Sequence, residues 1–181
     1  ELGTALADVL FGDYNPAGRL TQTWVKDITD LPDLLDYNIR NGRTYMYFQG
    51  KPLYAFGHGL SYTSFRYNSI ATNKENLEKD KTLTVSVSVS NTGKVDGEEV
   101  VQLYVKSIDS VVQQPIKALK AFQRVALKAG ETKMVNLTLK AKDLEYWNTT
   151  KQQFELEKGQ IEMQVGGASD AIQLTKKITL K

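Results

Sequence analysis

The spacing of hydrophobic residues differs between the two ends of the chain. Near the start, apolar residues recur every three or four positions, at Leu2, Ala5, Leu6, Val9 and Leu10. This spacing forms one stripe of an α-helix over residues 1–11, which Gly12 can end. Asn15-Pro16-Ala17-Gly18 then signals a turn into a short extended run, residues 19–24. A helix, a turn and a strand form one unit of an α/β layer, which needs a partner to cover both of its faces.

After Phe65 the hydrophobic period becomes two. Its clearest example is residues 83–90, where Leu and Val alternate with Thr and Ser up to the turn Asn91-Thr92-Gly93. Similar runs recur at 65–70, 101–105, 122–127, 135–139, 161–165 and 172–180, and residues 142–147 predict a short helical turn. About seven short strands separated by turns are typical of an immunoglobulin or fibronectin III β-sandwich. We therefore predict a mainly β fold.

Residues 25–64 show neither period. They are rich in Tyr and Phe and are interrupted by two prolines and four glycines. A loop of this length is uncommon in a compact domain unless it packs its own side chains or crosses between domains. The predicted division is therefore an α/β remnant at 1–24, a crossing linker at 25–64 and a β-sandwich at 65–181.

Composition narrows the possible functions. Lys and Arg number 23 against 21 Asp and Glu, so the net charge is only +2, which argues against a nucleic-acid groove or a polybasic membrane patch. The chain has no Cys and a single histidine, His58, so we predict no metal site and no cofactor. No apolar run approaches the roughly 20 residues of a membrane span. The start, Glu1-Leu2-Gly3, is neither an initiator Met nor a signal peptide, which predicts a fragment.

Carboxylate pairs are the remaining candidates for catalysis. Glycoside hydrolysis needs two carboxyl groups about 5–9.5 Å apart across one bond. Three pairs stand close in the sequence, Asp33 with Asp36, Glu98 with Glu99, and Asp143 with Glu145. We interpret all three as surface charge, because nothing in the sequence marks them as desolvated. No residue is assigned a catalytic role.

Aromatic side chains before residue 65 could either bind sugars or pack within the protein. Tyr45, Tyr47 and Trp24 can stack on sugars, but a segment that crosses between domains also needs buried rings to stay ordered. The sequence leaves both interpretations open and favours packing.

Several long motifs resemble one family. Gly3–Leu20 resembles the end of the α/β domain of glycoside hydrolase family 3, and Gly42–Phe48 with Pro52–Phe65 resembles its crossing segment. Asn91–Val105 resembles the opening of its fibronectin III-like domain. Members of this family are retaining exo-glycosidases for terminal β-linked sugars. The resemblance implies a nucleophile on an N-terminal barrel and an acid/base glutamate earlier in the α/β domain, and neither motif is present here.

The resemblance therefore implies the non-catalytic C-terminal part of a β-xylosidase or β-glucosidase, in the periplasm or outside the cell. Its partners would be the upstream catalytic domains of the same polypeptide, with an oligosaccharide as substrate of the parent enzyme. Arg43 and Tyr45 are candidates to approach that substrate, or alternatively an interdomain packing pair. The alternative function is an independent polysaccharide- or protein-binding module. An uncovered helix and linker would also cause self-association.

Overall fold

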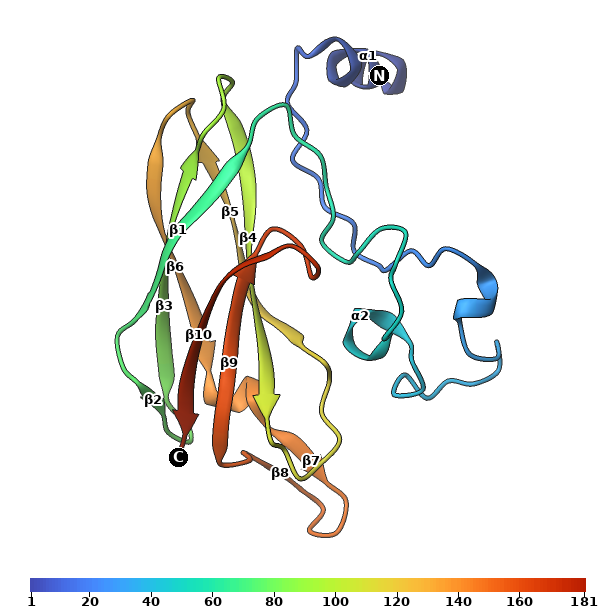
Figure 1. Cartoon of the computed structure of the whole chain (residues 1–181), viewed down its shortest axis with the longest axis vertical. Coiled ribbons are helices and arrows are strands. Elements are labelled where there is room, and N and C mark those ends of the chain that lie inside the picture. Colours follow the sequence, from blue (N-terminus) through green and yellow to red (C-terminus); the bar gives the residue numbers. More distant parts are fainter.

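Two facing sheets form the body of the molecule in the computed structural model, which describes residues 1–181 (Figure 1). One sheet has the strand order β1-β3-β6 and the other β2-β10-β9-β4-β5, while β7 and β8 form a separate hairpin. The strands are β1 (Phe65–Thr72), β2 (Asn76–Leu77), β3 (Thr82–Asn91), β4 (Gly97–Ile108), β5 (Ala118–Leu127), β6 (Thr132–Lys140), β7 (Tyr146–Asn148), β8 (Gln153–Glu155), β9 (Gly159–Gly166) and β10 (Ile172–Leu180). The mainly β sandwich is confirmed.

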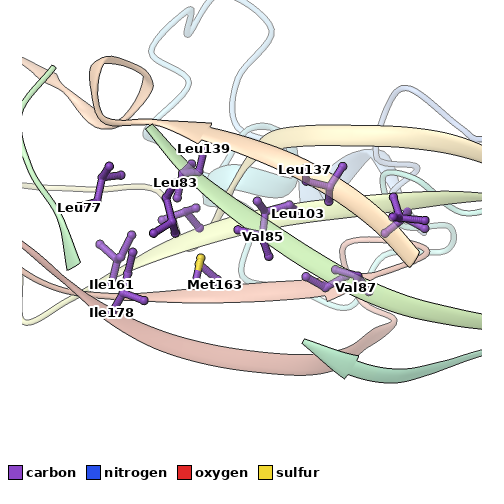
Figure 2. Packing of buried hydrophobic residues seen from close by; sticks show 14 of the residues in the cluster. Leu77, Leu83, Val85, Val87, Leu103, Leu137, Leu139, Ile161, Met163 and Ile178 are labelled. Carbon is purple, nitrogen blue, oxygen red and sulfur yellow. The ribbon is translucent and has the colours of Figure 1, made fainter. Parts of the chain in front are cut away.

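Alternating residues build the core because every second side chain of a strand points between the sheets. In β3, Leu83, Val85 and Val87 are fully buried. The register of β3 with β6 sets Leu83 opposite Leu139 and Val85 opposite Leu137, so inward residues meet inward residues. Figure 2 shows these side chains facing those of β4, β9 and β10 across the interior. The sandwich thus closes a hydrophobic core of its own.

The structure has more strands than the seven or so that the sequence predicts. The additional strands are β2, β7 and β8, which have only two or three residues each and are too short to show alternation. The helical turn predicted at 142–147 is a 3-10 turn, η2 (Ala141–Leu144), followed at once by β7.

The predicted helix near the start is α1 (Leu2–Phe11), which Gly12 ends in the left-handed conformation with φ 88°. None of its residues is buried. Residues 19–24 do not form the predicted strand, and only Trp24 makes a bridge, to Tyr54. Leu20 also pairs through its backbone, so this extended run is held by residues 53–58 of the same chain.

The crossing linker contains two short helical turns, η1 (Ile28–Asp30) and α2 (Thr44–Tyr47). The side chain of Asp27 accepts a hydrogen bond from the Thr29 N–H and so caps η1. Figure 1 shows this segment lying beside the five-stranded sheet, with α1 near the end of the segment that leads into β1. No helix in the structure is long and apolar enough to span a membrane.

The hairpin β7–β8 carries a carboxylate with a strongly lowered pKa. Glu155 accepts hydrogen bonds from Lys151 Nζ, Gln153 Nε2 and Asn148 Nδ2, each 2.8 Å long. These donors stabilise the ionised form and lower the pKa of Glu155 to about 2.

We expect the hairpin to weaken in acid for this reason. Because the folded pKa lies below the ordinary value of 4.5, ionised Glu155 stabilises the hairpin above that pH, and the stabilisation is lost as the pH falls through about 2. An NMR titration of the Glu155 carboxyl carbon should have its midpoint near 2. Asn148→Ala should raise this midpoint, whereas an ordinary midpoint in the unsubstituted chain would contradict the assignment.

Candidate functional site

Three aromatic rings join the crossing linker to the sandwich. Tyr45, on α2, stacks on Phe56 with ring centroids 4.3 Å apart and meets the edge of Tyr104, on β4, at 5.8 Å. The Tyr45 hydroxyl also accepts a 2.9 Å hydrogen bond from the Leu119 N–H of β5. Tyr104 points away from the core, on the face opposite Leu103, and is still completely buried. The linker therefore covers the outer face of the five-stranded sheet at this point.

Backbone hydrogen bonds hold the same contact. The Ile116 N–H donates to the carbonyl of Met46 over 2.8 Å, and the Ser169 N–H donates to the carbonyl of Phe56 over 2.9 Å. Each bond joins the linker to a connection between two strands of the sandwich. Since these donors and acceptors are paired within the chain, the contact is a specific one.

Gln102 is the polar centre of the contact. It is almost fully buried on β4, where its amide Nε2 donates to the Gly167 carbonyl and its Oε1 accepts from the Tyr104 hydroxyl. Gly57 of the linker lies directly over this amide, and a Cβ atom there would overlap it. Gly57 also has φ +85°, which L side chains rarely adopt.

A buried ion pair fixes the other end of the contact. Arg19 Nη2 lies 3.0 Å from Glu99 Oε1, and the two side chains are only 12% and 7% exposed. The same carboxylate oxygen accepts the Val100 N–H over 2.8 Å. Burial raises the pKa of Glu99, while the Arg19 guanidinium and the Val100 N–H act in the opposite direction.

The interpretation of Glu99 as surface charge is therefore wrong. The sequence contained a signal, because Glu99 shares its parity with Val101, Leu103 and Val105, which all face the core. Its neighbour Glu98 lies on the opposite side of β4 and pairs with Arg124 in solvent. No sequence signal marks Arg19 as the partner of Glu99, since 80 residues separate them.

One of the other two carboxylate pairs forms hydrogen bonds within the linker. Asp33 and Asp36 each accept the N–H two residues further on, at Leu35 and Asn38, and so shape turns of the linker. The structure contains no group of three or more His, Asp or Glu side chains that could hold a metal ion.

The two candidate substrate residues both have partners within the chain. Arg43 Nε and Nη2 donate to the carbonyls of Asp36 and Asp33, each over 2.6 Å, and close the loop between them. Tyr45 lies in the ring contact described above. Trp24 is about half exposed, at 48%, and Tyr47 is partly buried at the rim of a hollow. Contact of Arg43 or Tyr45 with a sugar stays a prediction.

Together, the fold and this contact define a class of protein: a fibronectin III-like sandwich with the segment that precedes it packed on one of its sheets. Two family models match it. Residues 1–62 match the glycosyl hydrolase family 3 C-terminal domain, and residues 99–169 match the fibronectin type III-like domain. The chain belongs to glycoside hydrolase family 3 and corresponds to its C-terminal region.

Known proteins agree with this assignment over the whole chain. The chain is 39% identical to the thermostable beta-glucosidase B of Acetivibrio thermocellus, over 98% of the chain and 25% of that protein. It is 41% identical to a xylan 1,4-beta-xylosidase of Xylanibacter ruminicola, over 93% of the chain and 19% of that protein. A crystal structure of beta-glucosidase from Kluyveromyces marxianus in complex with glucose superimposes with a TM-score of 0.90 and 36% identity, covering all of the chain and 23% of that protein. The chain thus spans about a quarter of the length of the relatives it matches.

Proposed function

We propose that this chain is the non-catalytic C-terminal part of a retaining exo-acting β-glycosidase, and that it braces the catalytic domains of that enzyme. Both beta-glucosidases and beta-xylosidases are among its relatives. The proposed substrate class is therefore a plant-type oligosaccharide with a terminal β-linked glucose or xylose. A relative in Salmonella typhimurium is a periplasmic beta-glucosidase, which supports a periplasmic or secreted parent enzyme.

The distribution of exposed apolar side chains supports bracing best. The sandwich has a closed core, and most of the large hydrophobic residues that are exposed lie in the segment before it. The stripe of α1 is uncovered, with Leu2 86% exposed, Leu6 58% and Leu10 67%, and Leu34 and Leu35 of the linker are also exposed. An exposed apolar stripe such as that of α1 marks an interface. Its proposed occupant is the remainder of the α/β domain and the barrel of the parent enzyme.

The surface of the three-stranded sheet disfavours an independent binding module. Its outward residues on β3 are Thr84, Ser86 and Ser88, and the opposing positions of β6 include Asn136 and Thr138. A polysaccharide-binding face needs a row of exposed rings, and this face offers hydroxyl and amide groups instead.

Arg43 and Tyr45 serve this proposal as packing residues that hold the linker in the shape its partners need. A second role for them, near the outer substrate subsites of the parent enzyme, depends on how the linker meets the catalytic domains. The uncovered α1 stripe also implies that the isolated chain self-associates. Sedimentation at rising concentration should detect this, and Leu6→Glu with Leu10→Glu should reduce it.

Activity assays test the bracing function. The purified chain should release no nitrophenol from aryl β-glucoside, β-xyloside or α-arabinofuranoside. A chimera of thermostable beta-glucosidase B, with its matching region replaced by residues 1–181, should hydrolyse the β-glucoside, and the same enzyme without that region should be inactive. Turnover by the chain alone, surviving repurification, would overturn the proposal. Full activity of the truncated enzyme would do so as well.

A further inference from the structure

A polar hollow of about 360 Å³ lies at the end of the sandwich that carries the hairpin β7–β8. Its walls come from the connection between β4 and β5, the chain around the hairpin, the adjoining ends of β4, β5, β9 and β10, and two residues of the crossing linker. In Figure 1 the connection and the hairpin lie together near the lower end of the molecule. The volume falls within the range of small-molecule sites, about 300–1,000 Å³.

Hydrogen bonds fix the walls of this hollow before any ligand arrives. The carboxylate of Glu157 accepts the Ser110 hydroxyl and, over 2.8 Å, the Val111 N–H, which ties the connection between β4 and β5 to the chain after β8. The Ile116 N–H, bonded to the Met46 carbonyl, ties the same connection to the linker. A preformed site loses less conformational freedom on binding than a flexible one.

The lining combines rings with neutral polar groups. Trp147, Tyr146 and Tyr47 offer aromatic surface, and Trp147 is 49% exposed. Gln113 and Gln160 are exposed and bring amide groups that can both donate and accept hydrogen bonds. The C–H face of a sugar ring packs on an aromatic ring while its hydroxyls bond to amides.

The charge and polarity of the lining residues favour a neutral sugar over other small ligands. The lining contains three basic residues, Arg40, Lys120 and Lys158, and three acidic ones, Asp109, Glu145 and Glu157. This balance does not favour a phosphorylated or carboxylated ligand. Only 9 of the 22 lining residues are hydrophobic, which disfavours an apolar ligand.

We propose that this hollow binds a short neutral saccharide, with Trp147 as its stacking platform. The proposal goes beyond the bracing function and does not depend on it. Arg40 and Tyr47 of the linker complete one wall of the site, and the other lining residues, Trp147, Gln113 and Gln160 among them, belong to the sandwich.

Calorimetric titration of the full chain with cellobiose and with xylobiose tests this site. We expect a dissociation constant on the order of 1 mM for at least one of them, because an open hollow covers only part of the ligand. Trp147→Ala should weaken binding at least about tenfold, and Gln160→Ala should weaken it less. Trp24→Ala is the matched control, since Trp24 is exposed to the same degree, at 48%, outside the hollow.

Three outcomes would overturn the proposal. These are no binding of either disaccharide up to about 50 mM, binding that Trp147→Ala leaves unchanged, and tighter binding of glucose 6-phosphate or glucuronate than of the neutral sugars. Circular dichroism of each variant checks folding, and Trp147→Phe, which keeps an aromatic ring, should retain part of the affinity if Trp147→Ala misfolds.

Discussion

Replacing Arg19 with methionine is expected to lower the free energy of opening residues 1–64 away from the sandwich by about 3–5 kcal/mol. The substitution leaves the Glu99 carboxylate buried without its counter-ion, and an unpaired buried charge is costly. Native-state hydrogen exchange measures the effect. The amides of Ile116, Leu119 and Ser169 donate to residues 45–56 across this contact and should exchange faster, while those of β3 keep their protection because the core is separate.

The neighbouring glutamate provides a matched control. Arg124 pairs with Glu98 in solvent, with side chains 52% and 36% exposed, so Arg124→Met should have a much smaller effect than Arg19→Met. Replacing both partners of the buried pair, as in Arg19→Met with Glu99→Leu, should recover most of the lost stability, because no charge remains buried. Equal effects of Arg19→Met and Arg124→Met would refute the role given to the buried pair.

Gly57→Ala is expected to cost about 2–4 kcal/mol at the same contact, for two reasons that add. The residue has φ +85°, where a Cβ atom is strained, and that Cβ would overlap the Gln102 amide. Gln102 cannot easily move aside, because it is buried and bonded to Gly167 and to Tyr104. The variant should therefore accelerate exchange of the Ser169 and Ile116 amides, which bond the sandwich to the linker, and expose the linker to proteases.

Gly42→Ala separates the two contributions. Gly42 has nearly the same backbone conformation, φ +89°, but open space where a Cβ would stand. Its substitution should cost only the conformational part, about 1–2 kcal/mol. If Gly42→Ala and Gly57→Ala cost the same, close packing of Gly57 on Gln102 would contribute nothing.

The predictions for Arg19→Met and Gly57→Ala both concern the contact between residues 1–64 and the sandwich, on which the proposed function depends. Residues 1–64 present the uncovered apolar surface, and the sandwich holds them through Arg19, Gly57 and Tyr45. A bracing element works only if this connection is rigid. In the chimera described above, Arg19→Met should therefore reduce glycosidase activity without abolishing it, because the catalytic residues of the barrel are unchanged.

The β-sandwich and the helix that precedes it can be predicted from local sequence patterns alone. Alternation in β3 and β6 and the stripe of α1 are local periodicities, and each reports which face of an element is apolar whatever it packs against. The family resemblance of Gly3–Leu20 and Asn91–Val105 was equally a property of the chain alone. These features needed no knowledge of distant contacts.

The features that could not be predicted all join residues that are far apart in the chain. Pairing of residues 19–24 with 53–58 replaced the strand predicted there, and the pair of Arg19 with Glu99 turned an expected surface charge into a buried one. Burial of Tyr104 likewise depends on Tyr45, which no periodicity places above it. The polar hollow gathers Tyr47, Gln113 and Trp147 from three separate segments, and such a site arises only when the chain closes on itself.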